Sequence, residues 1–455
     1  MRVKLIGRLG RENVVRQVQP EPERHAFPFR EFEAQWVTAE RLGTQRVRRE
    51  EPVATGVPVG RRSDVVRVVH HRHRYGLVPD LAVESHPVGP RSPCVVSATV
   101  ALNVLTRQIR TGLVQSQRVV NADPTESLLV VAQVDVSLGT DQGGSIRIPA
   151  AWCGCVGLKP TFGLVPYTGI VGLGHTFDHV GPLARTVERC AQTLQVLAGP
   201  DGLDPRQSAP DVGDYAGALT DDPQDIEVGV LAEGFGLEDS RPAVDEAVRR
   251  AVEGFADAGA AAVDVSVPMH TDGALLWTAI NYSAVTALVR DEGVGHFSQG
   301  YYDTSFQEAF AAARRTRADQ FPPTLKVSLI AGQYLADAYH GRYHARAQNL
   351  RRDLRRAYDE ALADVDVLAL PTVPKTAHPV APDRSVEDAL DRAHDMAMNT
   401  APFDITGHPA VSVPCGPVEG LPVGLMFVGR RHDDETVLAA ASAFESAVGW
   451  DGLRL

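Results

Sequence analysis

The sequence contains little lysine. Four of its 455 residues are lysine, against 41 arginines, and none lies between Lys4 and Lys159. A lysine can lose its proton near neutral pH when it is buried, whereas an arginine keeps its charge because its pKa is above about 12. Residues 5–158 therefore contain no lysine that could serve as a general base, and their arginines cannot replace one.

Cysteine is also scarce, and its pattern excludes a disulfide framework. The five cysteines are odd in number and scattered along the chain, at Cys94, Cys153, Cys155, Cys190 and Cys415. The pair in Cys153-Gly154-Cys155 does not have the spacing of a CxxC redox or zinc motif. We therefore expect buried thiols that pack as small apolar groups, in a protein of the reducing cytoplasm.

Long apolar runs are absent. No run approaches the roughly 20 residues of a membrane span, and the charged N-terminus lacks the apolar centre of a signal peptide. The tract His70–His73 cannot easily bring its imidazoles to one ion. We expect no membrane association, no metal and no cofactor.

The net charge and the pattern of apolar residues both change near residue 133. Residues 1–132 carry 20 Lys and Arg against 13 Asp and Glu, whereas the rest carries 25 against 44. The arginines of the basic segment are dispersed without regular aromatic residues, so nucleic-acid binding is not expected. We predict an atypical, poorly ordered segment over 1–132 and one folded core over 133–455.

From about Val134 the apolar periodicity sharpens, and strand and helix patterns alternate. Strands are predicted at 134–138, 225–231, 261–267, 365–371, 410–414 and 423–428. Helices are predicted at 186–198, 241–258, 304–319, 341–363 and 435–445. Residues 157–163 are predicted to be a turn-rich connection. This alternation is typical of an α/β fold with helices on the faces of a sheet.

The most informative run is Gly139–Ala150, which follows the first of these strands and places Ser145 behind two glycines. Glycines leave no side chain to shield the hydroxyl or the nearby backbone N–H groups, and such N–H groups can stabilise an oxyanion. The alternative is a Gly-rich turn in which Ser145 caps the following helix.

Three stretches closely resemble the amidase signature family of serine hydrolases: residues 134–163, residues 175–186, and residues 399–414 with 420–424 after them. The resemblance covers about residues 133–449. Residues 159–169 and 204–207 resemble the branch of amidases associated with nitrile hydratases, which act on short aliphatic and aromatic amides. The resemblance implies a large mixed β-sheet with helices on both faces, hydrolysis of carboxylic acid amides to acid and ammonia without a cofactor, and homodimers, which are frequent in this branch.

The resemblance also implies a nucleophile and an oxyanion hole. Ser145 matches the family's nucleophile, and the backbone N–H groups of Gln142, Gly143, Gly144 and Ser145 match its oxyanion hole. A free serine hydroxyl is a poor nucleophile, so the mechanism also needs a base within hydrogen-bond reach.

Four further residues match family positions. Asp141 and Arg147 would form a pair that braces the loop, and Asp178 matches a residue that helps to shape the site. For His408, packing in the core and contact with substrate remain alternatives.

The residues that would activate Ser145 depart from the family pattern. The family uses a lysine as base and a second serine as proton relay, the latter in a Gly-rich loop 24 residues before the nucleophile. Here that position is Asn121, no glycine lies within residues 120–127, and Lys159 does not match the family's base. The candidates by residue type alone are His175, Asp178 and His179.

Three explanations account for this departure. A shifted reading frame upstream of residue 133 explains the abrupt start of the resemblance and the opposite charge of the preceding segment. The others are a pseudo-enzyme that binds amides or a partner without hydrolysis, and an active variant with a different base. We expect the chain as printed to be inactive.

Two other functions remain open. One is the A subunit of a tRNA-dependent amidotransferase, which shares the signature around Ser145. Residues 175–185 and 204–207 disfavour this alternative. The other is that of a non-catalytic binding protein, which would use the basic segment over 1–132.

Overall fold

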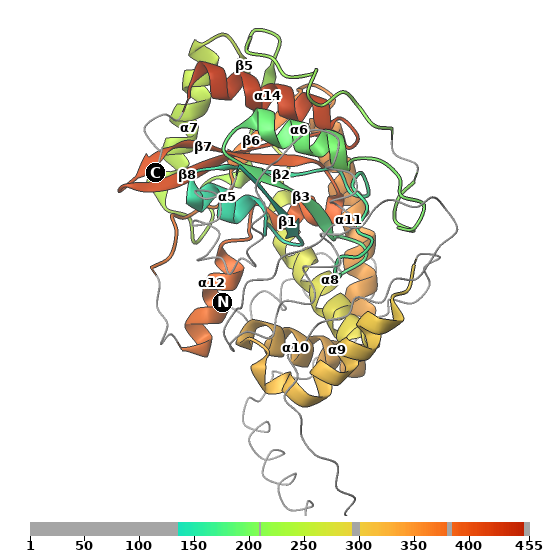
Figure 1. Ribbon diagram of the computed structural model, residues 1–455. Coiled ribbons are helices and arrows are strands. Elements are labelled where there is room, and N and C mark those ends of the chain that lie inside the picture. Colours follow the sequence, from blue (N-terminus) through green and yellow to red (C-terminus); the bar gives the residue numbers. More distant parts are fainter. Residues whose placement is uncertain (1–134, 209–210, 294–300, 380–384, 450–455) are drawn as a thin grey trace, which may run out of the picture. The chain divides into compact units, whose positions relative to one another are not determined.

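The computed structural model describes residues 135–208, 211–293, 301–379 and 385–449. These residues form a mixed eight-stranded sheet with helices on both faces (Figure 1), as the sequence predicts. The expectations for residues 1–132 and for Cys94 lie outside the described residues.

The strands follow the order β1-β3-β2-β7-β8-β6-β4-β5 in the sheet. Neighbours are antiparallel except for β4, which pairs in parallel with both β5 and β6. The strands are β1 (Val136–Asp141), β2 (Val156–Lys159), β3 (His179–Ala184), β4 (Glu227–Leu231), β5 (Ala261–Val265), β6 (Val367–Pro371), β7 (Ala410–Val418) and β8 (Leu421–Gly429).

Three amphipathic helices cover one face of the sheet: α6 (Val187–Leu197), α7 (Pro242–Asp257) and α14 (Asp434–Ala447). Helix α6 begins after Thr186, whose hydroxyl accepts a hydrogen bond from Arg189 N. Helix α7 buries the apolar stripe that its periodicity predicts, from Val244 to Phe255. These helices confirm the predicted apolar patterns.

On the opposite face, the short helix α5 (Arg147–Cys153) lies on β2, β7 and β8 (Figure 1). Two glycines allow this close approach. A Cβ on Gly157 would lie 2.6 Å from Ala150 Cβ, and a Cβ on Gly424 would lie 2.5 Å from Ala151 Cβ. The position of α5, and of the turn before it that carries Ser145, is therefore fixed by backbone contact with the sheet.

Further helices join α5 beside the sheet. Helix α8 contacts α10, α11 and α13, and α10 contacts α12. The sequence predicted α9 and α11 but not the other four. The helices are α8 (His270–Arg290), α9 (Thr304–Arg317), α10 (Pro323–Tyr339), α11 (Arg342–Ala361), α12 (Val386–Asp395) and α13 (Ala401–Thr406), and two 3-10 turns lie at η1 (Ala232–Gly234) and η2 (Ala318–Gln320).

The prediction for residues 157–163 is wrong over its first part. Val156–Lys159 is the fully buried strand β2, which lies between β3 and β7. Gly157 suggested a turn, but its missing side chain makes room for α5. The first predicted strand is displaced as well, because β1 extends to Asp141.

A buried histidine anchors α8 to the rest of the fold. His270 Nδ1 lies 2.6 Å from the Tyr358 hydroxyl on α11, and its Nε2 lies 3.1 Å from Asn399 Oδ1. The Asn399 amide donates to the carbonyl oxygens of Gly234 and Pro371. Burial lowers the pKa of His270 to about 4, since the charged imidazolium would lose its hydration.

We expect the protein to lose stability as the pH falls from about 6.5 to about 4. In this window the unfolded chain binds a proton at His270 that the folded chain excludes, at a cost of up to about 3 kcal/mol. Urea titrations across this range should show a smaller loss of unfolding free energy for His270→Gln than for the wild type. As a control, substitution of the exposed His340 by Asn (His340→Asn) should leave the pH dependence of the wild type unchanged. If His270→Gln loses as much unfolding free energy between pH 6.5 and about 4 as the wild type, His270 is not the group responsible.

Candidate active site

The loop that carries Ser145 is folded around the carboxylate of Asp141, the last residue of β1. Asp141 Oδ1 accepts a hydrogen bond of 2.5 Å from Gly144 N, and Oδ2 accepts bonds from Ile146 N at 3.2 Å and Arg147 Nε at 2.9 Å. One buried side chain therefore holds both the loop and the first turn of α5.

The carbonyl groups of the loop are held by other parts of the chain. The Trp277 indole donates to Gln142 O at 2.6 Å, and the Thr400 hydroxyl donates to Gly143 O at 2.6 Å. In a trans peptide the following N–H points away from the carbonyl. The N–H of Gly143 is therefore directed away from the Trp277 indole nitrogen.

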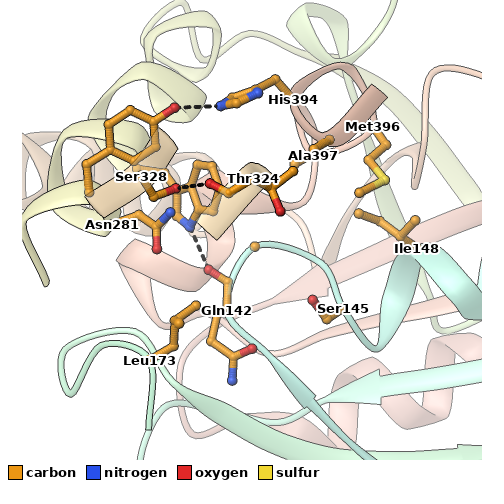
Figure 2. Close-up of a pocket in the computed structure, with 14 residues that line it drawn as sticks. Gln142, Ser145, Ile148, Leu173, Asn281, Thr324, Ser328, His394, Met396 and Ala397 are labelled. Carbon is orange, nitrogen blue, oxygen red and sulfur yellow. Dashed lines mark hydrogen bonds between the residues drawn. The ribbon is translucent and has the colours of Figure 1, made fainter. Parts of the chain in front are cut away.

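Ser145 is exposed and does not cap α5. The N-cap is Ile146, and no side chain caps the helix. Figure 2 shows the hydroxyl of Ser145 between Gln142 and Ile148, turned toward the pocket. Among the described residues, no hydrogen bond joins Ser145 Oγ to a histidine, a carboxylate or an amine.

Behind the loop lies a fully buried charge network. Arg147 pairs with Asp141 and, through Nη2 at 2.8 Å, with Asp404 on α13. Burial opposes ionisation of both carboxyls, but the Arg147 guanidinium holds the pKa of Asp141 well below its usual value. Burial and the neighbouring Asp141 raise the pKa of Asp404 well above its usual value. The network therefore favours one ionised carboxylate beside one guanidinium.

Two basic side chains border this network. Burial, together with Arg147, lowers the pKa of Lys159 to about 8, and Lys159 Nζ donates to His408 O at 2.5 Å. Burial also lowers the pKa of His179, whose Nδ1 lies 2.9 Å from Phe177 O. Both side chains are buried and hydrogen-bonded to backbone carbonyl groups.

Asp178 shapes the pocket through the backbone. Its buried carboxylate accepts hydrogen bonds from Leu173 N and Gly174 N, at distances of 2.9 to 3.3 Å. Leu173 lines the pocket beside Ser145. Burial raises the pKa of Asp178 to about 7.

The pocket has a volume of about 180 Å³, below the roughly 300–1,000 Å³ typical of drug-sized ligands. No Asp, Glu, Lys or Arg stands among the described residues that line it. The lining residues are Gln142, Gly143, Ser145, Ile148, Leu173, Trp277, Asn281, Tyr282, Thr324, Ser328, Ala393, His394, Met396 and Ala397.

Comparison with known proteins places this geometry in a family. A family model described as Amidase matches residues 127–438. The chain belongs to the amidase family. An enantioselective amidase of Rhodococcus rhodochrous is 42% identical over 329 residues, which are 71% of this chain and 63% of that protein. A glutamyl-tRNA(Gln) amidotransferase subunit of Chloroflexus aurantiacus is 37% identical over 72% of this chain and 66% of its own length.

Solved structures agree with this amidase assignment. The glutamyl-tRNA(Gln) amidotransferase subunit of Thermotoga maritima aligns with a TM-score of 0.56 and 27% identity, over 69% of this chain and 63% of its own. A bacterial aryl acylamidase of the amidase signature family shares the fold with a TM-score of 0.60, at 24% identity over 72% and 65% of the two chains. The chain thus spans less than two-thirds of the length of these relatives, between 63% and 66%.

Within this amidase fold, the predicted site residues fall into two groups. Ser145, Gln142 and Gly143 line the pocket. Asp141 and Arg147 lie behind the loop, where they pair as expected, and Gly144 donates its N–H to Asp141. Asp178 does not line the pocket, but its carboxylate accepts a hydrogen bond from the backbone of Leu173, which does. The histidines proposed by type, His175 and His179, do not line the pocket.

His408 packs in the core, one of its two predicted alternatives. Its Nδ1 lies 3.0 Å from Thr406 Oγ1 and its Nε2 lies 3.1 Å from Asp359 Oδ1. Sequence reasoning missed Trp277, Asn281 and Met396, which also line the pocket, because α8 and α12 were not identified. Helix α8 has an apolar rather than amphipathic composition, which hides its period.

None of the described helices is long and apolar enough to cross a membrane. In the described ranges, no group of three or more His, Cys, Asp or Glu side chains is placed to hold a metal ion.

We expect Arg147→Met to destabilise this amidase fold by about 3–5 kcal/mol, because it leaves two buried carboxyls without their cation. The measurement is the unfolding free energy from urea titration. Arg250→Met is the matched control, since Arg250 pairs with Glu246 on the exposed face of α7 and should cost less than about 0.5 kcal/mol. Equal effects of the two substitutions would contradict a central role for Arg147.

Proposed function

We propose that the described residues form the nucleophile and oxyanion-hole half of a serine-dependent amide hydrolase. The observation that carries this proposal is the exposed Ser145, which borders a pocket on a loop whose carbonyl groups are bound elsewhere. Ser145 Oγ would attack the amide carbon as its proton passes to a base. The leaving nitrogen would take up that proton and depart as ammonia, and water would then cleave the acyl-enzyme.

The negative oxygen formed by this attack would be held by backbone N–H groups of Gln142, Gly143 and Ser145. Each such donor is worth roughly 3 kcal/mol in transition-state stabilisation. The N–H of Gly144 is engaged by Asp141, so in this proposal Gly144 braces the loop.

The base and the relay are the missing half. Lys159 and His179 are held by the core, and residues 5–158 contain no lysine. We therefore propose that residues 1–132 are translated from a shifted frame and replace a segment with the lysine and serine of the family pattern. The start of the family match at residue 127 supports this boundary.

The pocket supports a short, neutral amide as substrate. An ammonium or carboxylate group on the substrate would find no opposite charge among the described lining residues. This feature, together with the 42% identity to an enantioselective amidase, favours an amidase of the nitrile-hydratase-associated branch over a component of an amidotransferase.

We also propose a cytoplasmic location. Cys153, Cys155, Cys190 and Cys415 are all free thiols in the described part of the chain, as expected in a reducing compartment. The expected homodimer stays a prediction.

We expect the chain as printed to release ammonia from a short amide roughly 10²–10⁴-fold more slowly than the Rhodococcus rhodochrous enantioselective amidase under the same conditions, because it lacks the base. Ser145→Ala should abolish the remaining activity, whereas the exposed Ser446→Ala should leave it unchanged. Residual hydrolysis that survives Ser145→Ala would show that Ser145 is not the nucleophile.

The shifted frame is tested by reading the genomic DNA upstream of codon 133 in all three frames. We expect one frame to encode a lysine and, 24 residues before Ser145, a serine in a Gly-rich loop. A chain carrying that segment in place of residues 1–132 should recover the missing 10²–10⁴-fold in rate. If no frame encodes these motifs, the proposal about residues 1–132 is overturned.

A further inference from the structure

One buried polar atom in the pocket wall is left without a partner. Asn281 on α8 lines the pocket and is 7% exposed. Its carboxamide oxygen makes no hydrogen bond within the described structure. An unsatisfied buried acceptor is destabilising unless a bound molecule donates to it.

The position of Asn281 is coupled to the nucleophile loop. Trp277 lies four residues earlier on the same face of α8. Its indole donates to Gln142 O, and its ring is packed so tightly on Gly143 that a Cβ there would lie 2.7 Å from Trp277 Cζ2. Figure 2 shows the carboxamide of Asn281 on the side of the pocket formed by Leu173 and Gln142.

Asn281 Oδ1 is the buried side-chain acceptor among the described lining residues that has no partner, whereas four other polar side chains of the wall do have partners. The Tyr282 hydroxyl lies 2.9 Å from His394 Nε2, and His394 Nδ1 lies 2.7 Å from Leu390 O. Ser328 Oγ donates to Thr324 O, and Gln142 Nε2 donates to Tyr167 OH. These bonds leave the Asn281 oxygen as an acceptor for a ligand.

The remaining wall is apolar. Ile148, Leu173, Trp277 and Met396 border the pocket, so a charged donor would be bound without a counter-charge. A neutral hydroxyl or amide N–H suits this site, since it can donate a hydrogen bond to Asn281 Oδ1 and carries no charge that would need a counter-charge.

We propose that Asn281 determines substrate specificity by accepting a hydrogen bond from a neutral donor on the acyl part of the substrate. The preferred substrates are then short hydroxy- or acylamino-carboxamides, and plain aliphatic amides bind more weakly because they leave the Asn281 oxygen unsatisfied. This inference rests on the proposed function, namely that the pocket binds amides.

Binding to the full chain as printed tests the inference without requiring turnover. Lactamide and isobutyramide differ by a hydroxyl in place of a methyl group, and 3-hydroxybutanamide and 3-methylbutanamide differ in the same way one carbon further out. In calorimetric titrations we expect the hydroxyl member of at least one pair to bind about 10-fold more tightly.

Asn281→Leu should reduce that preference to within about twofold. This substitution replaces an unsatisfied polar group by an apolar group of similar size, so the fold should persist. Thr278→Val on the same helix is the matched control and should keep the preference, because Thr278 Oγ1 bonds to Ala274 O and not to the pocket. In the wild type, the ¹⁵N-labelled side-chain amide of Asn281 should shift on addition of the tighter-binding hydroxyamide.

The outcomes separate the two proposals. If none of the four amides binds, both the proposed function and this inference are overturned. If the amides bind without a preference for hydroxyl, or if the preference survives in Asn281→Leu, the role of Asn281 is overturned while amide binding stands.

Discussion

The buried contact of Arg147 with Asp141 and Asp404 is the interaction on which the site depends. Arg147 is the first residue of α5, and its guanidinium binds Asp141 at the end of β1 and Asp404 on α13. Removing two carboxyls and a guanidinium from water is costly, and only close mutual contact offsets that cost. The close contacts of this arrangement offset that cost, and they also hold the loop between Asp141 and Arg147.

The fold separates charge from the pocket. The buried side chains of Asp141, Arg147 and Asp404 lie behind the loop that carries Ser145, whereas no Asp, Glu, Lys or Arg stands among the described residues that line the pocket. Asp141 influences that surface only through backbone N–H groups. A rigid polar frame of this kind can orient dipoles toward a reacting carbonyl without placing a competing charge beside it.

The sequence predicted one wall of the site better than the other. The short run from Asp141 to Arg147 contains its own bracing contacts, so its resemblance to the amidase signature was enough to predict the loop and the Asp–Arg pair. Regular amphipathic helices such as α7 were also identified. Helix α8 was missed because its apolar residues are spread around the whole helix and show no clear period. Trp277 and Asn281 were missed with it, since they lie far from Ser145 along the chain. Strand β2 was missed because Gly157 is typical of turns, although here it admits α5.

The contact of α5 with Gly157 and Gly424 has a consequence for how the substrate range of such a protein can evolve. Helix α5 cannot retreat toward the sheet, since no space remains there for even one methyl group. A larger ligand must therefore be accommodated on the other sides of the pocket, which α8, α10 and the residues at the end of α12 help to line. Mutation can alter these sides repeatedly while the loop that carries Ser145 stays in place, so the shape of the pocket is free to diverge faster than the position of that hydroxyl.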